Sequence, residues 1–429
     1  MEKIEAVVVG GGLAGLAAAY RLAAAGRQVI LLERGDAPGS KNVSGGRMYA
    51  APVRRYLPEI AGEAPFERRV VKEMIAVLDE DASVLMEAGT GAWRREPPMS
   101  YTVLRAPFDN WFSGKVMEKG GFVIPRRRVD DLLWEDGRVA GVKVGEEEIP
   151  AHIVIAADGA LSFMARKAAL RAEPAPGDHA VAIKELYKLD GHIIEDRFGL
   201  DAGEGAACLF MGAVTKGMFG GGFLYTNRDS LSVGIVISID ALMKQGRGLE
   251  SHRIMDDFIA RPEVRRWIKG GELREYAAHV ISEAGIGGLS KLYTGGMLVA
   301  GDAAGFALNL GLTVRGMEFA IASGALAAEV ADEALTKGDT SAQFLSLYEK
   351  KLRESFVMTD MATFRHSREA LENPRLFTVY PKFLCELFEA LFTVPDGPKA
   401  TLSGTAWEIA RKHVLTWEGL KDFLRLRRI

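Results

Sequence analysis

The N-terminal stretch 4–33 constrains the fold most, because it joins a strand, a glycine turn and a helix start in IEAVVVGGGLAGLAAAYRLAAAGRQVILLE. Its apolar, β-branched run 6–9 is typical of a buried parallel strand and stops at three glycines spaced GxGxxG. Gly10 permits a tight turn, Gly12 lets the backbone approach a pyrophosphate, and Gly15 lets the following helix pack against the strand. The positive N-terminal end of that helix then faces the phosphates.

The rest of this stretch agrees with that interpretation. We expect a helix over 16–25, rich in alanine and leucine, that ends at Gly26. A second apolar run, 29–32, brings Glu33 to the place where an acid binds a ribose hydroxyl. Strand, glycines, helix, second strand and acid together predict an adenine dinucleotide site, for NAD or FAD, rather than a structural glycine turn.

Length, charge and cysteine content bound the class of protein. At 429 residues the chain is long for one core, so we expect two or three interwoven domains. Its 54 lysines and arginines against 57 acidic residues give a formal charge of -3, which argues against a nucleic-acid partner. The two cysteines, Cys208 and Cys385, cannot supply the four thiolates of a typical iron–sulfur cluster. We therefore expect no metal site in this chain and a reducing compartment.

Two further expectations concern the membrane. The first residues run directly into the predicted strand, so we expect no signal peptide. Because no apolar stretch reaches ~18 uninterrupted residues, we expect no membrane-spanning helix, and any membrane contact would be peripheral.

The loop 34–46 and the middle of the chain are less informative. The loop is rich in turn-forming residues, which can lay backbone amides along a cofactor but also dominate ordinary surface connections. Further on, we expect Asp109 to cap the N-terminus of a helix. Segment 185–239 has the pattern of antiparallel strands in a second layer, and segment 249–270 has helical periodicity.

Two later strands are predicted to carry an acid to their C-terminal ends, where ligands of open α/β sheets collect. The run 152–157 ends in Asp158-Gly159, although such a pair is also an ordinary turn. The run 295–300 ends in Gly301-Asp302, before a glycine-lined segment and a small-residue helix. This second segment fits a site for an extended polar ligand and a packing motif equally well.

The tail from Phe344 onward is predicted to be largely helical. Segment 383–392 carries an apolar stripe, which we interpret as a core-facing helix rather than a membrane contact. Segment 417–428 sets apolar against basic residues. That pattern fits a membrane-surface or partner-docking helix as well as a solvated helix with one packed face.

The glycine turn, Asp158-Gly159 and Gly301-Asp302, in this order, resemble the FAD-binding group of aromatic hydroxylases, geranylgeranyl reductases and electron-transfer flavoprotein:quinone oxidoreductases. Three stretches match the FixC (EtfC) subgroup best, the quinone-oxidoreductase-like subunits of electron-bifurcating FixABCX (EtfABCX) complexes. They are 41–50 (KNVSGGRMYA), 104–111 (LRAPFDNW) and 220–225 (GGGFLY). The resemblance covers essentially the whole chain, and 41–50 is its most specific part.

The resemblance implies an α/β fold of the glutathione-reductase/hydroxylase type, in which a Rossmann-like FAD-binding domain carries an inserted antiparallel β-sheet domain and a helical C-terminal region. The expected FAD-binding domain is discontinuous, over 1–75, 101–178 and 292–350. The expected quinone or substrate domain covers 76–100 and 179–291, and 351–429 would be a helical region for partner or membrane docking.

The resemblance also implies the residues that hold the cofactor. It implies no catalytic side chain, because the chemistry belongs to the flavin. The expected FAD contacts are Gly10, Gly12, Leu13, Ala14, Gly15, Glu33, Arg34, Lys41, Ser44, Gly45, Gly46, Arg105, Asp158, Gly301, Asp302, Gly311 and Thr313. Gly220 and Gly221 would approach the quinone, and Gly222 stands where that family often has serine.

The implied function is FAD-dependent electron transfer from an electron-transfer flavoprotein to a membrane quinone, as the high-potential branch of flavin-based electron bifurcation. With two cysteines this chain is not expected to carry the ferredoxin-like domain of the single-chain quinone oxidoreductases. The implied partners are therefore the electron-transfer flavoprotein alpha and beta subunits and a FixX-like ferredoxin with the iron–sulfur cluster. The implied location is cytoplasmic, peripherally associated with the inner face of the cell membrane.

Three alternatives remain open from the sequence. A geranylgeranyl reductase-like enzyme or an NAD(P)H-dependent aromatic hydroxylase-like enzyme would share the fold and act on an organic substrate. A flavin-binding scaffold without turnover of its own would share the cofactor site alone.

Overall fold

A mainly parallel sheet carries the N-terminal strand in the computed structural model, which describes residues 3–42, 46–246 and 248–429. Its strands run in the order β16-β17-β10-β1-β2-β7, and β8 and β9 extend it as a hairpin. They are β1 (Ile4–Val9), β2 (Val29–Leu32), β7 (Phe122–Ile124), β8 (Asp131–Glu135), β9 (Arg138–Val144), β10 (Glu147–Ala156), β16 (Tyr293–Thr294) and β17 (Met297–Val299). β1 pairs in parallel with β2 and β10, and β10 pairs in parallel with β17. The glycine turn, Asp158 and Asp302 therefore follow neighbouring strands at one edge.

Helices rich in small residues pack on this sheet, because a parallel sheet must be covered. They are α1 (Leu13–Ala24), α2 (Ala50–Tyr56), α3 (Arg105–Glu118), α4 (Phe163–Lys167) and α9 (Met317–Lys337). α1 and α9 pack against each other so closely that a Cβ at Gly324 would lie 2.1 Å from the Ala14 carbonyl oxygen. The predicted first strand, first helix and small-residue helix all form.

The second sheet is mainly antiparallel, with the order β15-β11-β14-β13-β12-β4-β6-β3 and β5 beside β4. Its strands are β3 (Gly46–Tyr49), β4 (Arg69–Leu78), β5 (Ser83–Gly89), β6 (Ser100–Val103), β11 (His179–Lys188), β12 (Glu204–Gly212), β13 (Gly220–Thr226), β14 (Ser230–Ser238) and β15 (Glu272–Ser282). β4 belongs wholly to this sheet and crosses the domain boundary proposed after residue 75.

Short helices cover the outer face of the second sheet. They are α5 (Gly191–Phe198), α6 (Ile239–Gln245), α7 (Ser251–Ala260) and α8 (Pro262–Ile268). The segment predicted to be helical over 249–270 is two helices, because Pro262 cannot continue α7 and instead starts α8. Buried apolar side chains form one cluster around each sheet.

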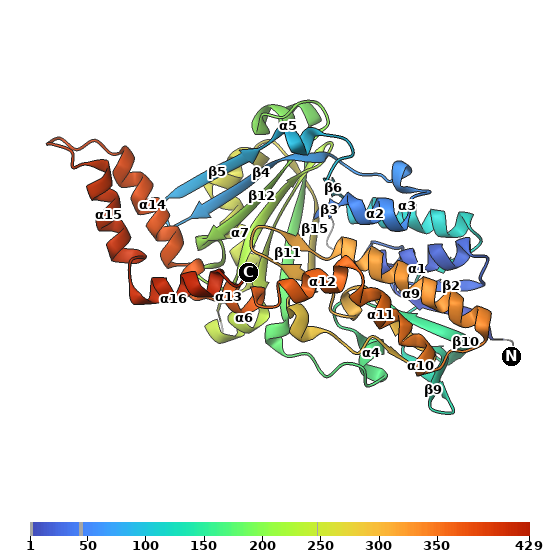
Figure 1. Cartoon of the computed structure of the whole chain (residues 1–429). Helices are drawn as coiled ribbons and strands as arrows, with labels where there is room; N and C mark the ends of the chain where they lie inside the picture. The colour runs from blue at the N-terminus through green and yellow to red at the C-terminus, as the bar shows by residue number, and fades with distance from the viewer. Residues whose placement is uncertain (1–2, 43–45, 247) are drawn as a thin grey trace.

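The C-terminal helices return along the molecule and then leave it (Figure 1). They are α10 (Ala342–Leu345), α11 (Leu347–Arg353), α12 (Phe356–Thr363), α13 (Ser367–Leu371), α14 (Val379–Phe392), α15 (Leu402–His413) and α16 (Trp417–Leu426). Helices α14 and α15 pack side by side and project from the edge of the second sheet near β5, whereas α16 runs back to α13. We call α14, α15 and α16 together the C-terminal arm.

One prediction about a helix is wrong. Asp109 does not cap a helix, because α3 begins at Arg105 with Leu104 as its N-cap, and Asp109 lies one turn inside it.

The predicted core-facing stripe of α14 is only partly covered. Phe383, Leu384, Leu387 and Leu391 are half-buried where α14 packs on α15 and on the edge of the second sheet, whereas the Phe392 side chain is 79% exposed. The periodicity identified an apolar face correctly, but other parts of the described chain cover it incompletely.

Candidate functional site

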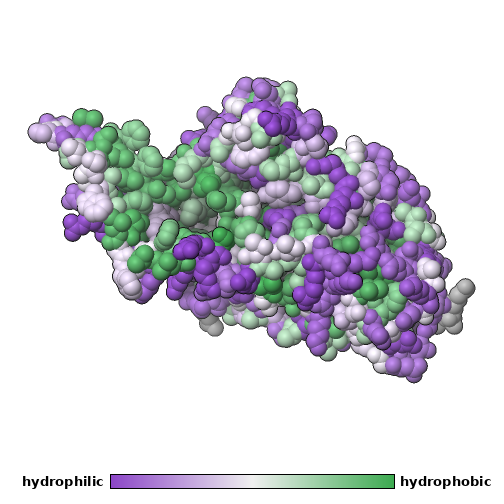
Figure 2. Space-filling view, viewed as in Figure 1, coloured by the Kyte–Doolittle hydropathy of each residue, from purple (hydrophilic) through white to green (hydrophobic). Residues whose placement is uncertain are grey.

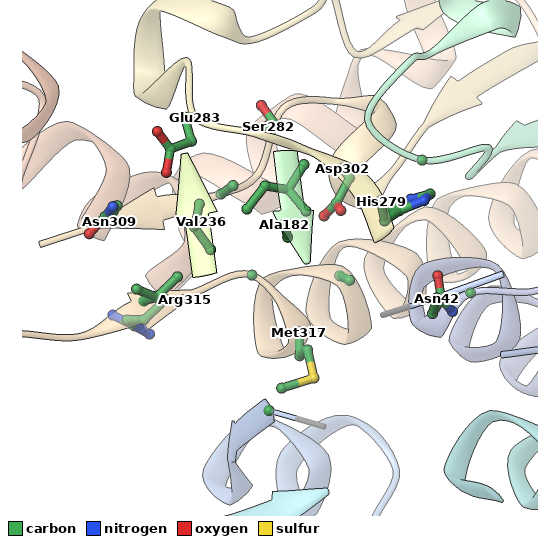
Figure 3. Close-up of a pocket in the computed structure, with 18 of the residues that line it drawn as sticks. Asn42, Ala182, Val236, His279, Ser282, Glu283, Asp302, Asn309, Arg315 and Met317 are labelled. Atoms are coloured by element: carbon green, nitrogen blue, oxygen red, sulfur yellow. The ribbon is translucent and has the colours of Figure 1, made fainter. Parts of the chain in front are cut away.

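A cavity of about 1000 Å³ lies between the C-terminal edge of the parallel sheet and the inner face of the second sheet. Its volume is at the upper end of the ~300–1,000 Å³ range of ligand pockets. In Figure 3, Ala182 and Val236 of the second sheet face Met317 at the start of α9 across this space. Asp302 and His279 lie toward one end, and Glu283 and Asn309 lie toward the other.

The glycine turn after β1 forms one wall of the cavity. Gly10 has φ +105°, and a Cβ there would lie 2.3 Å from the Ala157 carbonyl oxygen, so only glycine fits. A Cβ at Gly15 would lie 2.0 Å from the Gly10 oxygen, so Gly15 serves the packing of α1. Gly12 differs, because the nearest atom to its Cβ position is Arg105 Nη2 at 4.0 Å. The space above Gly12, at the open N-terminus of α1, can therefore receive a phosphate group.

Glu33 at the end of β2 is nearly buried and ties the turn to the following loop. Its Oε2 accepts a hydrogen bond from the Gly11 amide at 2.7 Å, and its Oε1 accepts one from the Gly35 amide at 2.5 Å. Each carboxylate oxygen has a further lone pair, so Glu33 can also accept a hydrogen bond from a ligand hydroxyl.

Basic side chains surround this end of the cavity, and Arg105 is the best anchored. Its Nε and Nη2 donate to Oδ1 and Oδ2 of Asp109 at 3.0 and 2.8 Å, and Asp109 is fully buried. Burial raises the pKa of the Asp109 carboxyl, while Arg105 and the Asn42 amide, 2.9 Å away, act to lower it. The other basic side chains that line the cavity here are Arg34, Lys41, Arg127, Arg128 and Lys167. Several arginine and lysine side chains at one end of the cavity suit the binding of a negatively charged pyrophosphate.

Two acids complete the polar end. Asp158 Oδ2 accepts a hydrogen bond from the Met164 amide at 3.0 Å, while its buried Oδ1 has no partner among the described residues. Burial raises the pKa of Asp158 and of Asp302, and Arg105 and Arg171 act against this shift at Asp302. A buried acceptor without a partner is costly, and a ligand hydroxyl would satisfy it. The open space at Gly12, the basic wall and these acids fit the phosphates and hydroxyls of FAD.

The structure brings most of the predicted site residues together. Those that line the cavity are Gly10, Gly12, Leu13, Ala14, Glu33, Arg34, Lys41, Gly46, Arg105, Asp158, Asp302, Gly311, Gly220 and Gly221. Gly15, Gly301 and Thr313 do not line it. Gly301 acts through packing, because a Cβ there would lie 2.7 Å from the Ala14 Cβ. The predictions for Ser44 and Gly45 lie outside the described residues.

At each of the three glycines of β13, a Cβ would collide with a different neighbour. A Cβ at Gly220 would lie 2.1 Å from the Val236 oxygen, and one at Gly221 would lie 2.7 Å from the Phe210 oxygen. A Cβ at Gly222 would lie 2.7 Å from Cζ of Phe258 in α7. The close packing of α7 therefore explains glycine at position 222.

Sequence reasoning missed several cavity-lining residues: His279 on the side of Asp302, and, toward the other end, Ser282, Glu283, Asn309 and Arg315. They come from the end of β15 and from the small hairpin of β18 (Leu308–Asn309) and β19 (Val314–Arg315). Asn309 and Arg315 lie in the glycine-lined segment after Gly301-Asp302, which was the available signal for them. No motif surrounds His279, Ser282 and Glu283.

Comparisons with known proteins agree with this geometry. A family model described as FAD dependent oxidoreductase matches residues 5–171, and one described as ETF-QO/FixC family C-terminal domain matches residues 367–429. The chain is 41% identical to Protein FixC of Escherichia coli (strain K12), covering 98% of this chain and 96% of that protein. It is 40% identical to a probable electron transfer flavoprotein-quinone oxidoreductase, YdiS, of the same organism, covering 92% of each chain. Protein FixC of Bradyrhizobium diazoefficiens is 35% identical over 98% of this chain and 97% of that protein.

Solved structures share the fold. A geranylgeranyl bacteriochlorophyll reductase-like protein from Thermoplasma acidophilum superposes with a TM-score of 0.73 at 22% identity, covering 99% of this chain and 100% of that one. The myxobacterial chondrochloren halogenase CndH superposes with a TM-score of 0.67 at 19% identity, covering 98% and 99%. At such identities the likeness extends to the fold alone.

Proposed function

Because the chain belongs to the ETF-QO/FixC family of FAD-dependent oxidoreductases, we propose that it passes electrons from an electron-transfer flavoprotein to a quinone. Membership confirms the predicted family, fold class, FAD cofactor and oxidoreductase class. Bound FAD supplies the redox chemistry, since a flavin exchanges electrons singly or in pairs. The residues of the chain bind it, orient it and exclude water.

The residues that line the cavity are the observation that most supports this proposal. One end has the glycine turn and basic side chains that suit a dinucleotide, whereas apolar residues from the C-terminal segment add to the lining of the cavity together with Glu283 and Asn309. The apolar residues are Leu371, Leu376, Phe377, Leu426 and Ile429. An apolar opening suits a lipid-soluble substrate such as a quinone, and Gly220 and Gly221 of β13 line the same cavity.

The proposed donor is an electron-transfer flavoprotein of alpha and beta subunits, with a FixX-like ferredoxin as a further partner. This chain would then be the high-potential branch of flavin-based bifurcation. The support is family membership: relatives over nearly the whole chain are named FixC.

A nicotinamide test separates this function from the reductase and hydroxylase alternatives, which share the fold. We expect NADH and NADPH to leave the flavin absorbance of the anaerobic, FAD-loaded protein unchanged, because its electrons come from another flavoprotein. Rapid bleaching by either nucleotide without partner subunits would contradict the proposal. The scaffold alternative predicts a photoreduced flavin that no quinone reoxidises.

We also propose that the C-terminal arm docks on an anionic membrane surface. Its exposed large apolar residues are Phe388, Phe392, Val394, Leu402, Trp407, Leu415, Trp417, Leu420, Phe423 and Leu424. Figure 2 shows apolar side chains gathered over the arm and the hollow beside it. Exposed apolar surface of this extent marks an interaction site, and basic residues such as Lys421 and Arg425 beside it suit anionic lipid. No helix among the described residues is long and apolar enough to cross a membrane.

The position of the C-terminal arm relates the proposed membrane docking to the entry of a quinone into the cavity. Leu426, the last residue of α16, and Ile429 line the cavity, while Trp417 at the start of the same helix is 69% exposed. A quinone dissolved in the membrane would therefore reach the cavity along apolar surface. This arrangement supports a peripheral position on the inner face of the cell membrane.

A double variant tests the docking surface. We expect Trp417→Glu with Phe423→Glu to lower binding to anionic vesicles by about 100-fold, because burying each aromatic side chain contributes ~1.5–3 kcal/mol. Flotation of the FAD-loaded protein with vesicles measures it. The matched control is Trp134→Glu on β8, where the side chain is also exposed but lies outside the arm. Equal flotation of the double variant and the control would contradict docking through the arm.

A further inference from the structure

Glu283 lies directly after β15, at the end of the cavity opposite the glycine turn (Figure 3). Its amide donates to the Asp178 carbonyl oxygen at 2.9 Å, which holds the backbone in place. The Asn309 side chain from the β18–β19 hairpin lies on the same side of the cavity and acts to lower the pKa of the Glu283 carboxyl. The carboxyl therefore has a defined position in the cavity wall.

A second, smaller cavity of about 40 Å³ adjoins the first, and Glu283 lines both. This volume is enough for about one water molecule. Polar side chains of Ser282, Asn309, Ser367 and Arg368 line it. Arg368 is partly exposed and is held by Asp178 at 3.0 Å and Glu372 at 2.7 Å. The small cavity thus lies between Glu283 and the partly exposed Arg368, and a water molecule in it could contact both side chains.

The environment of Glu283 suits proton exchange near neutral pH. Burial raises the pKa of its carboxyl to about 7, although Asn309 and Arg368 act to lower it. Glu372 raises it further. The charged groups facing Glu283 are thus Arg368 and Glu372 on α13 and Asp178 before β11, and they are paired with one another.

Other titratable groups around the main cavity are less well placed: the carboxyls of Asp158 and Asp302, whose pKa values burial also raises, lie at the glycine-turn end. Arg315 is held by Glu318 and Asp360 and stays charged. Burial raises the pKa of the Tyr225 hydroxyl strongly, which makes it a weak acid. Burial, with the charges of Arg34 and Arg105, lowers the pKa of His279 and keeps it neutral.

We propose that Glu283 delivers protons to the quinone, with the small cavity returning protons to Glu283 from solvent. This step rests on the proposed function. Reduction of a quinone to a quinol takes two electrons, supplied by the reduced FAD, and two protons. For each proton, an O–H bond forms at a quinone oxygen while the O–H bond of the Glu283 carboxyl breaks, and solvent restores the carboxyl proton. Glu283 is neither oxidised nor reduced.

Glu283→Gln tests the step, because glutamine keeps the size and polarity of the side chain but cannot donate the proton. In the FAD-loaded, photoreduced protein we expect reduction of a short-chain benzoquinone to fall about 100-fold at neutral pH. Reduction of ferricenium, which accepts an electron without a proton, should stay at the wild-type rate. Glu272→Gln, at the solvent-exposed start of β15, is the matched control and should behave as wild type.

The pH profile gives a second readout. Below pH 7 or so the Glu283 carboxyl holds its proton and can donate it, so the wild-type rate with quinone should fall as pH rises through about 7. Glu283→Gln should lose this inflection. Infrared spectra of the FAD-loaded protein should show a protonated carboxyl band that disappears over the same range in wild type and is missing in the variant.

The outcomes separate the two proposals. A Glu283→Gln protein with the wild-type quinone rate and pH profile overturns the role of Glu283 and leaves the proposed function standing. A wild-type protein that reduces ferricenium but no benzoquinone overturns the proposed function itself, and the proton step with it.

Discussion

A Gly12→Val variant is expected to fold and to lose FAD. Gly12 has φ -84° and ψ 180°, an extended conformation that valine adopts readily, and its Cβ position is open toward the cavity. The valine side chain would occupy the space in which a pyrophosphate approaches the N-terminus of α1. Losing two charge-assisted hydrogen bonds of ~1.5 kcal/mol each weakens binding roughly 100-fold. Titration of the apoprotein with FAD measures the loss.

Gly15→Val is the contrasting variant for this experiment. A Cβ at Gly15 would lie 2.0 Å from the Gly10 oxygen, so this substitution should prevent the native packing of α1 on β1. Thermal unfolding of the two apoproteins should show a transition close to wild type for Gly12→Val, and none or a much lower one for Gly15→Val. Tight FAD binding by folded Gly12→Val would contradict a phosphate site above Gly12.

The second large effect is expected at the ion pair of Arg105 and Asp109. Arg105→Met leaves the fully buried Asp109 carboxylate without its bidentate partner. Breaking a buried pair in this way costs ~3–5 kcal/mol. We expect the free energy of unfolding at neutral pH to fall by about that amount, with weaker FAD binding because Arg105 also faces the turn at Gly12. Urea unfolding of the apoprotein measures the first effect.

Two further variants test whether the loss of stability comes from the buried ion pair. Arg105→Met combined with Asp109→Leu should recover much of the lost stability, since apolar residues replace a buried ion pair at little cost. Arg126→Met removes an arginine of the exposed pair with Asp36 and should leave stability unchanged. Equal stability of wild type and Arg105→Met would show that the pair contributes nothing.

The elements around the glycine turn were predictable because their signals are local. β1, α1 and β2 follow from β-branched runs, a glycine pattern and an alanine-rich helix within residues 4–33. β10 and β17 were expected for the same reason, and their parallel pairing brings Asp158 and Asp302 to the edge that holds Gly10. The polar end of the cavity was therefore largely predicted from the sequence.

The errors and omissions involve contacts between distant parts of the chain. An apolar stripe such as that of α14 shows which face is apolar but not what covers it. Asp109 was read as a cap, although Arg105 four residues earlier is the spacing of an ion pair within a helix. Glu283 and Asn309 meet only because a hairpin folds over the end of β15, and no local pattern indicates that contact.

The C-terminal arm and the cavity fit one proposed path for the quinone and its electrons. In the proposed function, a lipid-soluble acceptor would enter among apolar C-terminal residues, and the cavity between the two sheets would hold FAD with its dinucleotide part at the glycine turn. The side chains near the acceptor then need only to position it, exclude water and supply protons.

Single-turnover oxidation of the photoreduced, FAD-loaded protein by a short-chain benzoquinone tests the central claim most directly. With oxygen excluded, we expect the oxidised flavin spectrum to return within the mixing experiment and one quinol to form for each FAD. A reduced flavin that persists in excess quinone, while the same protein is rapidly reduced by NADH or NADPH, would contradict electron transfer to quinone.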